Sequence, residues 1–200
     1  NTRLVGSEMC IRDSLNGGGG FPNQNKNSKI NDWKKLSESY YDASTEVDGT
    51  RIPILWGTDA VHGHNNVIGA TIFPHNIGLG ATRNIELIES IGQAVAKEVV
   101  STGIIWTFAP TIAVPRNDTW GRTYEGFSEN TDLVSKLGQS FIEGLQGEDK
   151  EFLDEYHVLA TAKHFVGDGG TFNGVDQGNT IINEKSLKDI HGKPYYEAID

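Results

Sequence analysis

Residues 84–109, NIELIESIGQAVAKEVVSTGIIWTFA, decide the fold class, because they predict a helix that leads directly into a buried strand. Asn84 is a preferred helix-capping residue, and Gly103 is typical of a helix end. Between them, apolar side chains at helical spacing predict one buried face. That face consists of Leu87, Ile88, Ile91, Val95 and Val99. The apolar run 104–109, which Pro110 ends, then predicts a strand.

The same alternation extends on both sides of this stretch. Upstream, a helical pattern from Ile30 is followed by the short apolar run 52–57, which predicts a strand. Downstream, we expect a helix over 131–145, a strand over 158–163, and a helix from Glu184 that bends near Pro194. Strands that alternate with helices predict parallel strands joined by crossover helices, and so an α/β fold.

The loops that follow these strands are unusually long. The strands begin near residues 52, 104 and 158, whereas one unit of a (β/α)8 barrel needs only about 31 residues. The excess lies in loops 60–81, 111–130 and 165–183. Such loops build the active sites of barrels and of open α/β sheets, so we expect the chemistry there.

Composition excludes several classes of function. With 27 acidic and 17 basic residues among 200, the net charge is −10, which argues against nucleic acid as a partner. The sequence contains no run of 18 apolar residues, which is the length that would predict a membrane-spanning helix. Cys10 is the only cysteine, so neither an intrachain disulfide nor a thiolate zinc site is expected.

The N-terminal region lacks any periodic pattern. Residues 1–29 include four consecutive glycines at 17–20, and we expect a loop or a non-native tail there, followed by one domain over 30–200. The sequence begins without Met and stops within a helical pattern, so we expect it to be an internal piece of a longer protein.

The first loop offers two kinds of site. Asp59 follows a strand, where a carboxylate either points into a cleft or binds its own turn. His62 and His64 have a spacing found in metal-dependent barrel hydrolases, in which Lys163 would be a bridging ligand. We favour the alternative without a metal, in which both imidazoles hydrogen-bond loop groups.

The second and third loops suit a sugar ligand. Trp120 offers a ring on which a sugar can stack, and Arg122 offers charge-assisted hydrogen bonds to hydroxyls. In the alternative interpretation, an arginine–carboxylate pair ties this loop down, and either role could apply to Arg116 and Glu125. At the third strand end, Lys163-His164 supplies adjacent polar groups for neighbouring hydroxyls.

Three motifs together resemble family 3 glycoside hydrolases, most closely the β-glucosidase and β-glucan exohydrolase branch. They are GTDAVHG at 57–63, WGRTYE at 120–125 and AKHF at 162–165, supported by TIFPHN at 71–76 and FVGDGG at 165–170. The resemblance covers residues 30–200. It implies that this chain is an incomplete (β/α)8 barrel of the TIM type, with about three to four βα units.

The resemblance also implies an activity. The family residues that match Asp59, Arg122, Lys163 and His164 hold the non-reducing glucose in the −1 subsite. By this likeness, the parent protein would cleave terminal β-glucosyl residues from β-glucosides or β-glucans with retention of configuration, which requires two carboxyl groups. No cofactor or metal is implied. Because such polymers lie outside the membrane, we expect a periplasmic or secreted enzyme.

The catalytic pair is expected outside this chain. In the family, the nucleophilic aspartate lies in a Ser-Asp-Trp type motif on a later strand, and no Ser-Asp-Trp occurs here. The acid/base glutamate comes from a following C-terminal domain that this chain lacks. We therefore expect residues 1–200 alone to be inactive and poorly stable. A metal-dependent hydrolase that uses His62, His64 and Lys163, and a non-catalytic glycan-binding protein, remain the alternatives.

Overall fold

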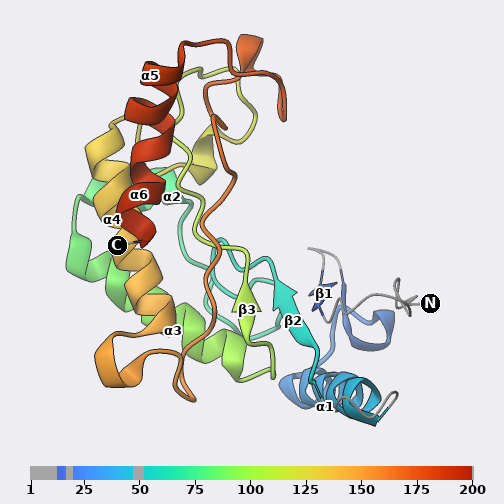
Figure 1. Cartoon of the computed structure of the whole chain (residues 1–200). Coiled ribbons are helices and arrows are strands. Elements are labelled where there is room, and N and C mark those ends of the chain that lie inside the picture. The colour runs from blue at the N-terminus through green and yellow to red at the C-terminus, as the bar shows by residue number, and fades with distance from the viewer. Residues whose placement is uncertain (1–12, 17–19, 47–51, 200) are drawn as a thin grey trace.

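The computed structural model describes residues 13–16, 20–46 and 52–199 (Figure 1). The strands are β1 (Asp13–Asn16), β2 (Leu55–Thr58) and β3 (Trp106–Thr107). The helices are α1 (Ile30–Glu46), α2 (Asn76–Thr82), α3 (Ile85–Val100), α4 (Thr131–Gln146), α5 (Glu184–Ser186) and α6 (Lys193–Ile199). The π-helix η5 (Leu187–Gly192) joins the last two, and short 3-10 turns are η1 (Pro22–Gln24), η2 (Thr123–Glu125), η3 (Asp149–Glu151) and η4 (Phe172–Gly174).

The strands form a parallel sheet in the order β1-β2-β3. The segment 158–163 lies beside β3 and is also parallel to it, through the isolated bridges Trp106–Leu159 and Thr111–Lys163. The Leu159 carbonyl accepts from Thr107 N over 2.8 Å, and Leu159 N donates to Ile105 O over 2.9 Å. Four neighbouring parallel segments, with helices between them, confirm the α/β alternation.

Two features differ from the sequence expectations. Residues 13–16, expected to be loop or tail, form β1, whose register pairs Asp13 with Leu55 and Asn16 with Thr58. A strand of four residues is too short to show a period, and its parallel partner lies 42 residues away along the chain. The three expected strands are also shorter than predicted, since β2 and β3 span only four and two residues and the segment 158–163 pairs through isolated bridges. Pro53, inside the expected strand 52–57, has no N–H group to donate to a neighbouring strand.

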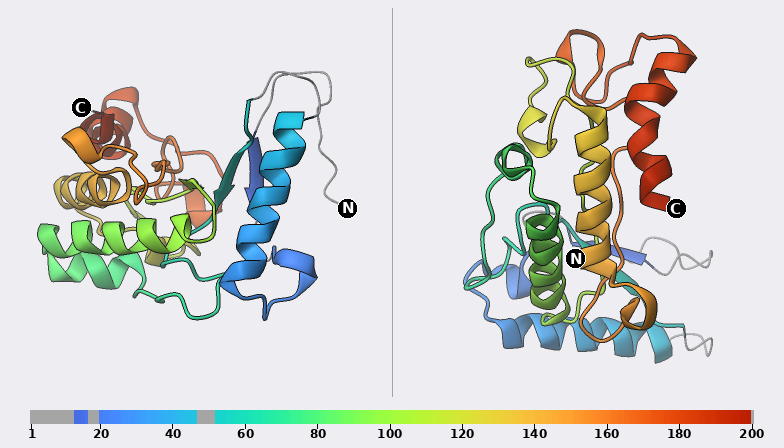
Figure 2. Two further views of the ribbon diagram at one scale, coloured as in Figure 1. Left: turned by 90° about the horizontal axis from the view of Figure 1, so that it is seen from below. Right: turned by 90° about the vertical axis from the view of Figure 1, so that its left-hand side faces the viewer.

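The helices α3 and α4 pack side by side and carry much of the core (Figure 2). As predicted, the Asn84 side chain caps α3 by accepting from Leu87 N over 3.0 Å. Ile88, Val95 and Val99 are fully buried, but Leu87 is 40% exposed, contrary to prediction. Leu87 precedes Ile88 by one residue, so its side chain lies about 100° around the helix from the buried stripe.

The C-terminal helical stretch continues this layer, since α6 packs on α4. The stretch from Glu184 is helical as predicted, and the π-helix η5 replaces the α-helical pattern just before Pro194. The proline ring has no N–H to donate, which disrupts the regular α-helical ladder at this point. Within the described ranges, the helices are too short or too polar to cross a membrane.

Candidate functional site

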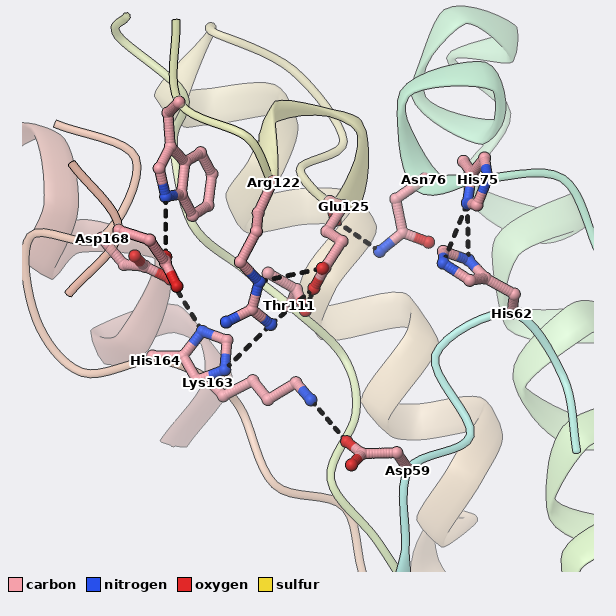
Figure 3. Close-up of polar contacts among 12 residues, drawn as sticks. Asp59, His62, His75, Asn76, Thr111, Arg122, Glu125, Lys163, His164 and Asp168 are labelled. Atoms are coloured by element: carbon pink, nitrogen blue, oxygen red, sulfur yellow. Dashed lines mark hydrogen bonds and ion pairs between the residues drawn. The ribbon is translucent and has the colours of Figure 1, made fainter. Parts of the chain in front are cut away.

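The loops after the strand ends bring the four predicted site residues together (Figure 3). Asp59 directly follows β2, and Lys163 ends the segment that lies beside β3. Arg122 precedes the turn η2, and His164 follows Lys163 through a cis peptide bond. Because the carboxyl ends of parallel strands meet at one edge of the sheet, residues far apart in the chain converge there.

Asp59 and Lys163 form an ion pair across two strand ends. The Lys163 ammonium donates to Asp59 Oδ1 over 2.8 Å. The Lys163 side chain is 12% exposed and the Asp59 side chain 42% exposed. The pair therefore holds the lysine against the sheet while the aspartate carboxylate stays open to hydroxyl groups of a ligand. Hydrogen bonds to such a charged acceptor are about twice as strong as neutral ones.

Arg122 forms a bidentate salt bridge with Glu125. Arg122 Nε and Nη2 donate to the two carboxylate oxygens over 2.9 and 2.8 Å. Burial by itself would raise the pKa of Glu125, but the hydrogen bonds and charge of Arg122 outweigh it and lower that pKa. The hydrogen bond to Glu125 raises the pKa of Arg122 in turn. Asn76 Nδ2, on α2, fixes the turn by donating to the Glu125 carbonyl over 2.8 Å.

His164 lies between a carboxylate and the guanidinium. Its Nδ1 is 2.7 Å from Asp168 Oδ2, and its Nε2 is 3.3 Å from Arg122 Nη2. The site thus presents cationic donors, an accessible carboxylate and an imidazole within one edge of the sheet. Such an arrangement can bind a ligand rich in hydroxyl groups, which both donate and accept hydrogen bonds.

Two carboxylates of the site were not assigned a definite role by the sequence. Glu125 was considered either as a ligand-binding group or as the partner of an arginine, and the structure places it as the partner of Arg122. In the sequence, Asp168 stands out only as part of the motif FVGDGG at 165–170. Its spacing of four residues from His164, between Gly167 and Gly169, is the signal that the sequence offered.

Two other loop residues lie elsewhere than expected. Trp120, predicted to stack on a sugar, is 1% exposed, and its Nε1 donates to Asp176 Oδ1 over 3.0 Å. Its ring belongs to the core of the loop, so no ligand can stack on it. The Arg116 guanidinium donates to the Glu129 carbonyl over 2.9 Å, and not to a carboxylate.

The histidines of the first loop do not come together as the metal-dependent alternative requires. His64 is fully buried and its Nε2 lies 3.0 Å from Thr102 Oγ1, and burial lowers its pKa to about 4. His62 instead contacts His75, with 2.9 Å between His62 Nε2 and His75 Nδ1. Burial, followed by the charge of His75, lowers the pKa of His62. Across residues 13–16, 20–46 and 52–199, no group of three histidine, cysteine or acidic side chains is placed to hold a metal ion.

Comparison with known proteins gives consistent likenesses. The sequence profile described as glycosyl hydrolase family 3 N terminal domain matches residues 14–200. A lysosomal beta glucosidase of Dictyostelium discoideum is 34% identical over 170 residues, which are 84% of this chain and 21% of that protein. A beta-xylosidase of Formosa agariphila is 33% identical over 171 residues, covering 83% of this chain and 24% of that protein.

Comparison with a solved structure shows that the similarity holds for the fold as well as for the sequence. The exo-1,3/1,4-beta-glucanase of a Pseudoalteromonas species is 54% identical with a TM-score of 0.90, over 94% of this chain and 24% of that one. This similarity confirms the incomplete TIM-type barrel. The chain spans about a fifth to a quarter of the length of these relatives. The profile match over residues 14–200 shows that the chain belongs to glycosyl hydrolase family 3, within the N-terminal domain of that family.

Proposed function

We propose that the protein that contains this chain hydrolyses terminal, non-reducing β-D-glucosyl residues of β-glucosides or β-glucans, with retention of configuration. In this proposal, residues 30–200 belong to the N-terminal barrel domain, and Asp59, Arg122, Lys163 and His164 hold the sugar in the −1 subsite. The observation that carries the proposal is the convergence of these four side chains at one edge of the sheet. The names of the glucosidase and glucanase relatives support it.

Each side chain has a definite task in this proposal. The exposed Asp59 carboxylate accepts hydrogen bonds from sugar hydroxyls, while Lys163, which it binds, donates to them. Arg122, fixed by Glu125, donates to a further hydroxyl. Because every such bond is charge-assisted, these side chains together can hold a single sugar ring firmly enough to select it.

The nucleophile and the acid/base come from residues outside this chain in the same proposal. Retaining hydrolysis needs two carboxyl groups about 5 to 5.5 Å apart, one of them free to attack the sugar. The three carboxylates at the site are already bound, Asp59 to Lys163, Glu125 to Arg122 and Asp168 to His164. They suit positioning and binding better than attack on the anomeric carbon.

The test is the kinetics of the full-length enzyme on aryl β-glucosides. We expect turnover of nitrophenyl β-glucoside with retention, and Asp59→Ala should lower kcat/KM about ten- to a hundredfold, because a hydrogen bond to a charged group contributes about 1.5 to 3 kcal/mol. Asp132→Ala is the matched control, since it removes another aspartate–lysine pair, with Lys193 over 2.7 Å. It should leave kcat/KM unchanged.

Other outcomes would contradict the proposal in distinguishable ways. Turnover of the β-xyloside in preference to the β-glucoside would assign another sugar to the site. Glucose binding without turnover would indicate a glycan-binding protein, and loss of activity on chelation of metal ions would favour the metal-dependent alternative.

A further inference from the structure

We infer that Asp168 is a positioning residue that holds the His164 imidazole in one tautomer, with the proton on Nδ1 and the Nε2 lone pair facing the sugar site. The inference rests on the proposed sugar-binding role of His164. It adds to that role the reason why this histidine accepts a hydrogen bond at the site instead of donating one.

The two neighbours of His164 select the same tautomer. An ionised carboxylate only accepts hydrogen bonds, so the Asp168 oxygen, 2.7 Å from Nδ1, requires a proton on that nitrogen. A guanidinium only donates, so Arg122 Nη2, 3.3 Å from Nε2, requires a lone pair there. A proton on Nε2 would face the guanidinium donors. The identity of its two neighbours therefore fixes the tautomer of the ring.

Asp168 lies in a turn whose backbone is fixed by hydrogen bonds to neighbouring segments. Its side chain is 10% exposed, whereas that of His164 is 38% exposed, so the carboxylate is the shielded partner. The glycines on either side have φ angles of +102° and +84°, which residues with a Cβ rarely adopt. The Gly169 carbonyl accepts from Arg116 N over 2.7 Å, and the Gly167 carbonyl accepts from Thr180 Oγ1 over 2.6 Å. A positioning residue needs such fixed support.

The resulting chain of contacts links two loops of the site. It runs from Asp168 through His164 and Arg122 to Glu125, with a carboxylate at each end (Figure 3). At 3.3 Å the contact between the ring and the guanidinium is the longest in the chain, so a sugar hydroxyl can replace it. That hydroxyl would donate to His164 Nε2 while its oxygen accepts from Arg122. Without Asp168, the ring could turn an Nε2–H donor toward the same hydroxyl.

The first test needs no substrate. In the full-length protein labelled with ¹⁵N-histidine, with the His164 signals assigned by their loss in His164→Gln, we expect a protonated Nδ1 and an unprotonated Nε2. Asp168→Asn keeps the shape of the side chain, but its amide can donate to Nδ1, so the Nε2–H tautomer should become populated. A protonated Nε2 as the main form in the unsubstituted protein would overturn the inference.

The second test measures binding of glucose by calorimetry. Asp168→Asn should weaken glucose binding about two- to tenfold, the range expected for a lost hydrogen bond to the neutral imidazole. The chain offers a closely matched control in Asp154, whose Oδ1 also lies 2.7 Å from a histidine Nδ1, that of His157. Asp154→Asn should leave glucose affinity unchanged. An equal loss in both variants would show a general effect on stability and overturn the inference.

The double variant shows whether Asp168 acts through His164. If it does, Asp168→Asn should add no further loss of glucose affinity once His164 is already Gln, whereas additive losses would overturn the inference. A full-length protein that neither binds glucose nor hydrolyses β-glucosides would instead contradict the proposed function. In that case the tautomer measurement still decides whether Asp168 positions the ring.

Discussion

At the scale of single residues, the Arg122 side chain is fixed by contacts with two residues of the site. It donates to both oxygens of Glu125 and contacts His164. We expect Arg122→Lys to lower kcat/KM of the full-length enzyme by about a hundredfold, mainly through KM, because an ammonium cannot make a planar, two-pronged contact. Arg116→Lys is the control, since Arg116 donates to the Glu129 carbonyl. Equal effects of the two substitutions would contradict a specific role of Arg122.

The buried His64 makes the stability of the fold depend on pH. Its pKa is lowered by burial from 6.5 to about 4, so between these values the unfolded chain binds a proton that the folded chain does not. Stability is therefore lost as the pH falls from 6.5 towards 4, by on the order of 3 kcal/mol. Thermal unfolding of the full-length protein across this range should show a shallower pH dependence for His64→Gln. Parallel curves for the two proteins would contradict the prediction.

At the scale of elements, α3 and α4 approach closely because glycines lie between them. A Cβ at Gly144 would lie 2.2 Å from the Glu89 carbonyl oxygen, and one at Gly92 would lie 2.7 Å from the Phe141 carbonyl oxygen. We expect Gly144→Ala to lower the free energy of unfolding by about 1 to 3 kcal/mol, because the helices must separate. Denaturant titration of the full-length protein measures this change.

The control for this prediction is a glycine in a helix with open space around it. At Gly78, in α2, a Cβ would meet only Pro74 at an ordinary 3.7 Å. Gly78→Ala should therefore be neutral or stabilise the protein by about 0.4 to 1 kcal/mol, since alanine restricts the unfolded chain. A loss at Gly78 as large as that at Gly144 would contradict the prediction, because a Cβ at Gly78 meets no close contact and alanine has the higher helix propensity.

Helices and strands could be predicted where residues close together in the sequence determine them. The cap of α3 at Asn84 and the helix expected over 131–145 follow from residues close together in the sequence, and both are present. β1 was missed because four residues carry no readable period and its partner β2 lies far along the chain. The segment 158–163, predicted as a strand, lies beside β3 but pairs through isolated bridges.

At the scale of the whole molecule, the site is an assembly of three loops, and the sequence could predict its members but not their contacts. Asp59 and Lys163 are 104 residues apart, and Arg122 and His164 are 42 apart. Strand ends of a parallel fold predict that such residues share an edge. Which donor meets which acceptor depends on side-chain packing. Asp168 therefore became visible as a partner of His164 only in the structure.

The last prediction concerns residues 1–200 produced by themselves. We expect this chain to release no nitrophenol from an aryl β-glucoside, because its three site carboxylates are bound to Lys163, Arg122 and His164 and leave no pair for attack and protonation. We also expect it to bind hydrophobic dyes, since Phe165 beside the site is 78% exposed and Ile199 is 81% exposed. The measurement compares the isolated chain with the full-length enzyme at equal concentration. Turnover of the aryl β-glucoside by residues 1–200 would contradict the prediction and show that residues of this chain alone perform the chemistry.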